Sequence, residues 1–543
     1  MQVAQGNDLI SSQQNQKSFF TSPLVVALLL FVMFFLIQLS GWHKDFSFDE
    51  PHNLRYGKDF LTKGPLAETD GQRMPVFALH ALACESYGCV PEKTIDQPWR
   101  RAWIRLPSIL FTLALGLLVW YWCRSLYGTQ AAIGSLLLYV FNPTLLAHGK
   151  EITSDAITSF FVVLAVFLFW KWRTSKKDRF FYFTAIVTGV AIVTKFSSIL
   201  LLFILPLIII LPHIYKRNFR VSFPAFWKAL KKSVVFLFLV WLIINSAYLF
   251  QGSFESSRSY AWQSRFYQKI SKVDFPIPLP RIFVRGLDYS HYIEENDQYG
   301  RGNNYILGHR HRKGRDYAFL VMILLKTPLA FFLILFAALA SRKSRKAPLP
   351  SQDSPGPYLW IPFTVWLLFF SSFCDVQVGI RYILPGYVFL IIFAGKAFQD
   401  ISSKRKAAVL GAASLWYVLS VLSYHPHYIP YFNELIGNRI NAYKYLADSN
   451  LDWEDKSYYI KKWEAAHPKI RYQTHSEAMT HPQPGFFLMP ANAYVGVMDQ
   501  DQLAWIREFK PLAHIAYSHY LLYVTPEELA LALKKHPIPG VKK

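Results

Sequence analysis

Runs of apolar residues long enough to cross a lipid bilayer recur along this chain of 543 residues. A helix needs about 20 mostly apolar residues to span the hydrocarbon core, and its backbone must satisfy its own hydrogen bonds there. The sequence predicts about eleven such helices. Their expected ranges are 23–39, 107–123, 131–147, 156–170, 181–193, 199–211, 234–250, 317–339, 358–373, 383–398 and 407–424. One such run could be a buried core helix, but so many, in a chain that is 52% hydrophobic, indicate a polytopic α-helical membrane protein.

The basic residues predict which ends of these helices face the cytoplasm. The net charge is +23, and Lys and Arg concentrate in the connections between apolar runs. This pattern is the topology signal of membrane proteins, so no nucleic-acid partner is expected. With the N-terminus inside, the cytoplasmic connections begin near Arg124, Lys171, Lys216, Arg342 and Lys404, and all but the first are dense basic clusters.

Three long segments then lie on the extracytoplasmic side, namely 41–104, 251–316 and 425–543. Residues 1–424 form the predicted transmembrane domain. The remainder, 425–543, is predicted as a small soluble α/β domain with strands at 486–489 and 520–524 and a helix at 526–535. Glu527 and Glu528 favour the N-terminal end of that helix.

Two cysteines, Cys84 and Cys89, lie close together in the first extracytoplasmic segment. An oxidising compartment would allow a short disulfide between them. Two free thiols are equally compatible with the sequence.

Charged and polar side chains at the ends of the apolar runs are the candidate functional residues, because charge at a membrane edge is costly. On the predicted topology they gather at the extracytoplasmic surface. They are Asp49, Glu50, His148, Asp155, Lys195, Lys326 and Arg381. Each alone has a plainer explanation, such as a helix cap or a cation that reaches lipid headgroups. Together they predict one site, in which carboxylates deprotonate a hydroxyl and cations hold a phosphate.

The order of several short motifs resembles the C-type glycosyltransferases of the protein O-mannosyltransferase and aminoarabinose transferase group. The motifs are Phe48-Asp49-Glu50, Asn142-Pro143-Thr144 leading to Thr153-Ser154-Asp155, Thr194-Lys195-Phe196, Leu325-Lys326-Thr327-Pro328, Gly379-Ile380-Arg381-Tyr382, Pro430-Tyr431-Phe432-Asn433-Glu434 and Asp448-Ser449-Asn450-Leu451-Asp452-Trp453. The resemblance implies the C-type architecture and a donor sugar carried on polyprenyl phosphate. The sequence departs from the group at Gln72-Arg73-Met74-Pro75, where a proline-rich contact is only loosely present.

The resemblance also implies roles for the acidic residues. Asp49 is expected to be the catalytic base on the acceptor hydroxyl, Glu50 to assist it or bind a cation, and Asp155 to face the same cavity. Adjacent residues of a helix do not face one point, so one of Asp49 and Glu50 should serve a neighbour. No cofactor follows with certainty; a divalent cation, Mg²⁺ or Mn²⁺, stays open, with these three carboxylates as its candidate ligands.

The basic residues are expected to hold the carrier phosphate. Lys195, Lys326 and Arg381 are the candidates, with Arg381 favoured because a guanidinium offers a planar fork to phosphate. His148 and Arg55 are accessory candidates.

The implied reaction is an inverting displacement in the plasma (inner) membrane, with the active site extracytoplasmic. Polyprenyl phosphate leaves into the bilayer while a protein, lipid or glycan hydroxyl arrives from the aqueous side. A transporter or flippase of a lipid-linked sugar is one alternative, although internal repeats and midplane charges typical of transporters are not evident. A polysaccharide polymerase or ligase is another, because 251–316 is rich in Lys and Arg. The sugar, the acceptor and the oligomeric state stay open.

Overall fold

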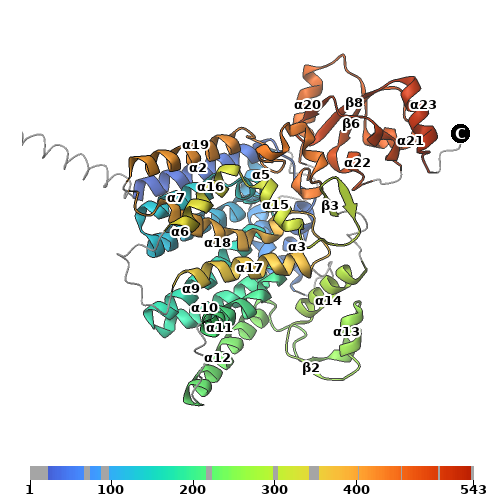
Figure 1. Cartoon of the computed structure of the whole chain (residues 1–543). Helices are drawn as coiled ribbons and strands as arrows, with labels where there is room; N and C mark the ends of the chain where they lie inside the picture. The colour runs from blue at the N-terminus through green and yellow to red at the C-terminus, as the bar shows by residue number, and fades with distance from the viewer. Residues whose placement is uncertain are drawn as a thin grey trace, which may run out of the picture.

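The computed structural model describes the chain in nine stretches, residues 23–65, 74–86, 97–215, 223–296, 304–341, 354–401, 403–453, 455–498 and 502–539 (Figure 1). Its α-helices are α2 (Pro23–Trp42), α3 (Glu50–Lys63), α4 (Ala78–Glu85), α5 (Pro98–Ile104), α6 (Leu106–Tyr127), α7 (Thr129–Val140), α8 (Pro143–His148), α9 (Asp155–Ser175), α10 (Asp178–Thr194), α11 (Leu201–Tyr215), α12 (Phe223–Ala247), α13 (Arg265–Ile270), α14 (Arg281–Asn296), α15 (Ala318–Lys326), α16 (Leu329–Ala340), α17 (Gly356–Ser372), α18 (Leu384–Ala394), α19 (Lys404–Leu422), α20 (Ser457–Ala466), α21 (His475–Thr480), α22 (Ala491–Val495) and α23 (Pro526–Lys535). Its strands are β1 (Glu255–Ser256), β2 (Pro276–Ile277), β3 (Asn304–Ile306), β4 (His309–His311), β5 (Tyr472–Gln473), β6 (Gly485–Pro490), β7 (Ala513–Ile515) and β8 (His519–Val524).

The predicted class, a polytopic α-helical membrane protein, is confirmed. Each of the eleven predicted apolar segments is helical for most of its length. Within the described residues, seven helices are long and apolar enough to cross a membrane, and the bent pair α15 and α16 brings the number to eight if it counts as one span. The predicted number of eleven therefore stays a prediction.

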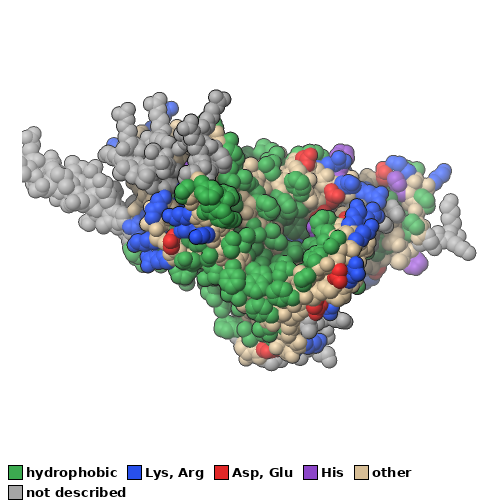
Figure 2. All heavy atoms as spheres, turned by 90° about the horizontal axis from the view of Figure 1, so that it is seen from below, with side chains coloured by type: hydrophobic (Ala, Val, Ile, Leu, Met, Phe, Trp, Pro, Cys, Tyr) green, Lys and Arg blue, Asp and Glu red, His purple; other side chains and the backbone are tan. Residues whose placement is uncertain are grey.

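The long helices form one bundle with a lipid-like exterior. Helix α9 packs against α10, α6 and α18, while α10 also packs against α12. Large apolar side chains point outward from the bundle, as Phe31, Leu117, Phe238 and Leu415 do. Figure 2 shows a broad apolar band between two zones that carry charged side chains. Such an exterior fits a hydrocarbon solvent, because it offers few polar groups to water.

The predicted span 317–339 is not one straight helix. It is broken between α15 and α16, whose axes differ by 104°. Thr327 precedes a proline and takes an extended conformation, which ends α15. The side-chain amide of Asn433 donates to the carbonyls of Leu324 (2.5 Å) and Thr327 (2.7 Å), so backbone acceptors freed by the break are satisfied. Pro328 is the sequence signal for the end of α15. Asn433, which satisfies the freed carbonyls, lies more than a hundred residues away in the chain.

The C-terminal residues form a small sheet at one end of the bundle (Figure 1). Its strand order is β5-β6-β8-β7, with β6 and β8 antiparallel. Strands β6 and β8 and helix α23 cover the predicted strands and helix, so these three predictions are confirmed. The division at residues 424 and 425 stays a prediction. The connecting segment packs on the bundle, since Tyr431 and Phe432 are buried in the same apolar core as the membrane helices.

Some sequence predictions fall partly or wholly outside the described residues. The basic clusters that begin near Lys216 and Arg342 do so, as do Gln72, Arg73 and Cys89. Cys84 is disulfide-bonded. The free-thiol alternative is therefore wrong for Cys84.

Candidate active site at one end of the helix bundle

Arg381 joins two carboxylates that are far apart in the chain. Its Nη1 lies 3.0 Å from Asp49 Oδ2 and 3.7 Å from Asp155 Oδ2. Lys195 Nζ lies 2.5 Å from the other oxygen of Asp155, Oδ1. We call Asp49, Asp155, Lys195 and Arg381 the Arg381 cluster. The structure thus brings together four of the predicted site residues.

Each member of the Arg381 cluster stands at the end of a helix. Asp49 precedes α3 and Asp155 is the first residue of α9, where the positive end of the helix dipole favours a carboxylate. Lys195 directly follows α10, which runs antiparallel to α9. Arg381 lies in the 3₁₀ turn Ile380–Ile383 that leads into α18. The cluster therefore occupies one end of the bundle rather than its middle.

Burial differs sharply between the two carboxylates. The Asp155 side chain is 3% exposed, whereas that of Asp49 is 36% exposed. A buried carboxylate held by two cations is fixed in its ionised form and serves mainly to orient them. Asp49 is the carboxylate that an incoming hydroxyl can reach from water.

Aromatic rings fix the direction of the two cations. The guanidinium of Arg381 lies 4.1 Å from the centre of the Trp453 ring and 5.4 Å from that of Tyr382. The ammonium of Lys195 lies 5.3 Å from the Tyr382 ring. Cations are attracted to the faces of aromatic rings at these separations. The sequence motif that ends in Trp453 contributes this wall, a role the sequence did not predict.

Trp453 is positioned by the close approach of two segments, one around Asn450 and the other around Val378–Ile380. Asn450 accepts from the Ile380 amide (3.1 Å) and donates to the Val378 carbonyl (3.1 Å). A Cβ on Gly379 would lie 2.4 Å from Ser449 Oγ, so a larger residue would displace the hydroxyl that donates to the Val378 carbonyl. Gly379 therefore allows the close approach of the segment that bears Trp453.

Glu50 pairs with Arg105 and not with the Arg381 cluster, and its catalytic role stays a prediction. Its carboxylate accepts from Arg105 Nε (2.8 Å) and Nη2 (2.6 Å), and also from the amides of Ser47 (2.7 Å) and Ile152 (3.0 Å). Burial raises the pKa of Glu50 to about 7, against the lowering effect of Arg105. The expectation that one of Asp49 and Glu50 serves a neighbour matches this geometry.

Glu50 belongs to a second, buried group of charges beneath the first loop. This Glu50 network contains Lys44, Glu50, Arg105, Lys150, Glu151, Asp455 and Lys456. Lys44 Nζ lies 3.0 Å from Asp455 Oδ2, so the network ties the first loop to the segment before α20. Burial lowers the pKa of Lys44 and of Lys456 well below the ordinary value. Buried pairs of this kind fix geometry more than they add stability.

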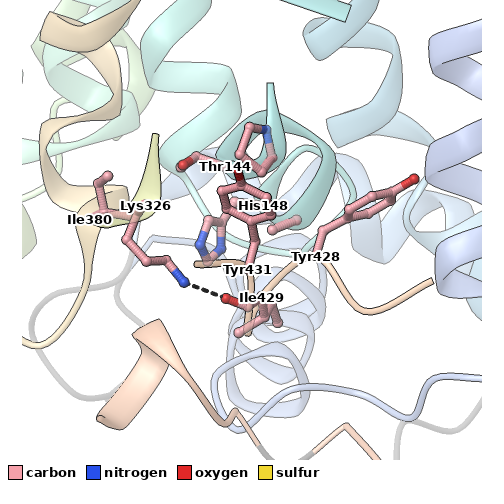
Figure 3. A pocket seen from close by; sticks show the side chains of 9 residues that line it. Thr144, His148, Lys326, Ile380, Tyr428, Ile429 and Tyr431 are labelled. Atoms are coloured by element: carbon pink, nitrogen blue, oxygen red, sulfur yellow. Dashed lines mark hydrogen bonds between the residues drawn. The ribbon is translucent and has the colours of Figure 1, made fainter. Parts of the chain in front are cut away.

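Lys326 is engaged elsewhere, which argues against its predicted phosphate role. Its ammonium donates to the carbonyls of Ile429 and Asn450, both at 2.6 Å. Figure 3 shows the side chain directed at Ile429 beside His148, at a small cavity of about 10 Å³. The two carbonyls and the Phe432 ring, at 4.5 Å, surround the charge. Lys326 therefore stabilises the segments around Ile429 and Asn450, the second of which leads to Trp453.

His148, an accessory candidate, interacts electrostatically with Arg381 and Asp155 of the Arg381 cluster. The His148 ring lies edge-on to Trp453, with 5.6 Å between ring centres. Arg55 is exposed on α3.

The predicted divalent cation finds no shared set of carboxylates. The Arg381 guanidinium lies between Asp49 and Asp155, and Glu50 faces Arg105 instead. In the part of the chain that the structure describes, no three or more His, Cys, Asp or Glu side chains could hold one metal ion. These residues do not fit the predicted site.

The fold and the Arg381 cluster define a helical membrane protein with a charged centre at one end of its bundle. Residues 100–244, less than half of the chain, match the family model described as dolichyl-phosphate-mannose-protein mannosyltransferase. The predicted resemblance to this group is confirmed over those residues. No curated protein matches the chain in sequence.

Several solved structures are similar to the chain at low sequence identity. ArnT from Cupriavidus metallidurans, bound to undecaprenyl phosphate, is 14% identical, with 93% of this chain and 98% of that chain covered and a TM-score of 0.47. The oligosaccharyltransferase of Archaeoglobus fulgidus in complex with Zn and sulfate is 12% identical, with 75% and 52% covered and a TM-score of 0.43. The oligosaccharyltransferase AglB of the same organism, with an inhibitory peptide and a dolichol-phosphate, is 12% identical, with 76% and 56% covered and a TM-score of 0.44.

Proposed function

We propose that this protein is a membrane glycosyltransferase that moves a sugar from a polyprenyl-phosphate carrier to an acceptor hydroxyl. The observation that carries the proposal is the contact of one guanidinium with an exposed carboxylate, Asp49, and a buried one, Asp155. The family match over residues 100–244 supports the same class of reaction.

In the proposed reaction each member of the Arg381 cluster has one task. Asp49 accepts the proton of the acceptor hydroxyl, whose oxygen attacks the anomeric carbon of the donor sugar. The bond from that carbon to the phosphate oxygen breaks, and the phosphate leaves with the electron pair. Arg381 and Lys195 stabilise the negative charge that develops there. Asp155 orients both cations, and attack opposite the leaving group inverts the anomeric centre.

The proposed active site faces the extracytoplasmic side. Two basic clusters lie at the far end of the bundle, because α9 ends and α10 begins beside Lys176 and Lys177, and α19 begins at Lys404. Asp155 and Lys195 stand at the other ends of α9 and α10. Cytoplasmic connections carry an excess of Lys and Arg, so the Arg381 cluster is assigned to the opposite side.

The same placement favours an enzyme over a flippase. Transporters usually bind their substrates near the bilayer midplane, on interrupted helices. The charges of the Arg381 cluster stand at helix ends instead. Lys326, next to the break between α15 and α16, already donates to two backbone carbonyls.

The proposal is tested with the purified protein and a panel of polyprenyl-phosphate sugars, with carrier release and labelled acceptor as readouts. Asp49→Asn should abolish transfer, with a loss of about 10²-fold or more for a general base. Asp59→Asn is the matched control, since Asp59 lies on α3 and pairs with Lys63 instead. Near-normal transfer by Asp49→Asn, or transport of a donor without any transfer, would reject the proposal.

A further inference from the structure

A second cavity lies in the C-terminal part of the chain, apart from the Arg381 cluster. It has a volume of about 310 Å³, at the lower end of the usual range of small-molecule sites. Its polar lining includes Asp452, His475 and His519, and its apolar lining includes Ile460 and Met498. We call it the His519 pocket.

We propose that the His519 pocket binds an uncharged, hydroxyl-rich ligand, a saccharide, and that this saccharide is part of the acceptor. The second half of the proposal rests on the proposed glycosyltransferase function. The first half concerns the pocket alone and stands on its lining.

The charges of the pocket do not suit an anionic ligand. The one cation in the lining, Lys456, is already bonded to Asp455 and is buried. The carboxylate of Asp452 interacts electrostatically with Lys456 and with Lys44, so the charges of this wall offset one another. A phosphate or an acidic sugar would therefore meet no cation in the lining that is not already paired.

The remaining groups suit hydroxyls. Burial lowers the pKa of His519, so its imidazole is neutral at physiological pH and can both donate and accept. The apolar side chains of Ile460 and Met498 can contact the C–H groups of a sugar ring. Asn492 is not available, since it accepts from the Asp448 amide and donates to the Asp452 carbonyl.

The pocket borders the segment that walls the Arg381 cluster. Asp452, in the lining, is followed directly by Trp453, whose ring lies against Arg381. Asp448 interacts electrostatically with Asp49 on one side and with Asp452 on the other. The pocket and the Arg381 cluster are therefore neighbours along one segment, and the acceptor role proposed for the saccharide rests on this adjacency.

The test uses the full-length protein in detergent. Binding of the neutral trisaccharides maltotriose and mannotriose, and of trigalacturonic acid, is measured by saturation-transfer NMR. We expect a neutral trisaccharide to bind and the acidic one not to bind. Met498→Trp, at the exposed rim, should remove binding by filling the pocket. Leu531→Trp is the control, because Leu531 is exposed on α23 and outside the lining.

His519→Ala provides a second variant, which should weaken the same binding by about tenfold through a lost hydrogen bond. Preferred binding of the acidic trisaccharide would reject the proposed saccharide site. Binding of a neutral trisaccharide that persists in both Met498→Trp and His519→Ala would reject it as well. If Met498→Trp removes saccharide binding but the protein transfers no sugar, the saccharide site is supported and the acceptor role is rejected. In an active protein, Met498→Trp should raise the acceptor KM and leave the donor KM unchanged.

Discussion

Arg381 and Asp49, 332 positions apart in the sequence, form an ion pair of 3.0 Å at one end of the helix bundle. The pair combines a group suited to a phosphate with the most exposed carboxylate of the cluster. The same nitrogen, Nη1, also lies 3.7 Å from Asp155, while the guanidinium lies against the Trp453 ring. That geometry makes the type of cation at position 381 decisive.

Arg381→Lys should therefore lower activity although it keeps the positive charge. A lysine ammonium cannot reproduce the planar group that lies against Trp453, nor the fork that a guanidinium offers to a phosphate. We expect kcat/KM for the lipid donor to fall by about 10- to 100-fold, mainly through a higher donor KM. The measurement is steady-state transfer at varied donor concentration. Arg285→Lys on α14, where the side chain is exposed, is the control. An unchanged donor dependence would contradict the phosphate role.

Glu50→Gln should lower both stability and turnover without changing how the donor binds. The substitution leaves Arg105 buried, with only Glu151 at 3.9 Å as an acidic partner. Removing one member of a buried ion pair costs on the order of 3 kcal/mol. The Glu50 carboxylate accepts from the amides of Ser47 and Ile152, which lie in the segments that bear Asp49 and Asp155. Loss of these hydrogen bonds should displace both segments, so we expect kcat to fall.

The measurement for Glu50→Gln is thermal unfolding of the purified variant, followed by kinetics at a temperature where it is folded. Glu527→Gln, on the surface of α23, serves as the control. A stable Glu50→Gln protein with a changed donor KM would support the role in catalysis or cation binding that the sequence predicted.

Lys326→Met separates a positioning role from a phosphate-binding one. The variant leaves the carbonyls of Ile429 and Asn450 without their donor, at about 1–3 kcal/mol for each buried group. Unfolding should therefore shift to lower temperature while the donor KM stays within about twofold of the native value. Lys534→Met on the exposed face of α23 should change neither quantity. A large rise in donor KM with unchanged melting would show that the sequence-based role was right.

The sequence predicts the helices and the location of the charges well, because both depend on local patterns. Apolar length marks each span, and charge at a helix end is evident from Asp155 or Lys195 alone. The direction of a side chain is not local. Asp49 and Glu50 are neighbours in the chain, yet one turns to Arg381 and the other to Arg105. Lys326 likewise resembles a phosphate ligand until its two carbonyl partners, from later segments, are known.

The wall residues were missed for a related reason. Trp453 carries no charge, and its motif stands beyond the last span, so neither hydropathy nor charge singles it out. Its role follows only from the docking of the Asn450 segment on Val378 and Ile380. The motif that ends in Trp453 contributes to the family resemblance, but it does not indicate what the tryptophan contacts.

Asp448→Asn should stabilise the protein at neutral pH and have no effect in acid. Burial raises the pKa of Asp448 to about 6, with a further contribution from Asp49. The folded protein thus binds a proton that the unfolded chain releases near pH 4, so wild-type stability falls as pH rises from about 4 to 6. Asparagine escapes this loss. It also tolerates the left-handed backbone of residue 448, where φ is 55°, and can accept from the Ser449 amide as Asp448 does.

The check is the melting temperature of wild type and Asp448→Asn between pH 4 and pH 8. The difference should be absent at pH 4, grow between pH 4 and 6, and stay constant above about pH 7. Asp274→Asn, on an exposed turn, is the control for a general charge effect. A difference that is already complete at pH 4 would mean that the carboxylate is ionised throughout. In that case Arg381 would outweigh burial, and Asp448 would act as a third anion of the Arg381 cluster.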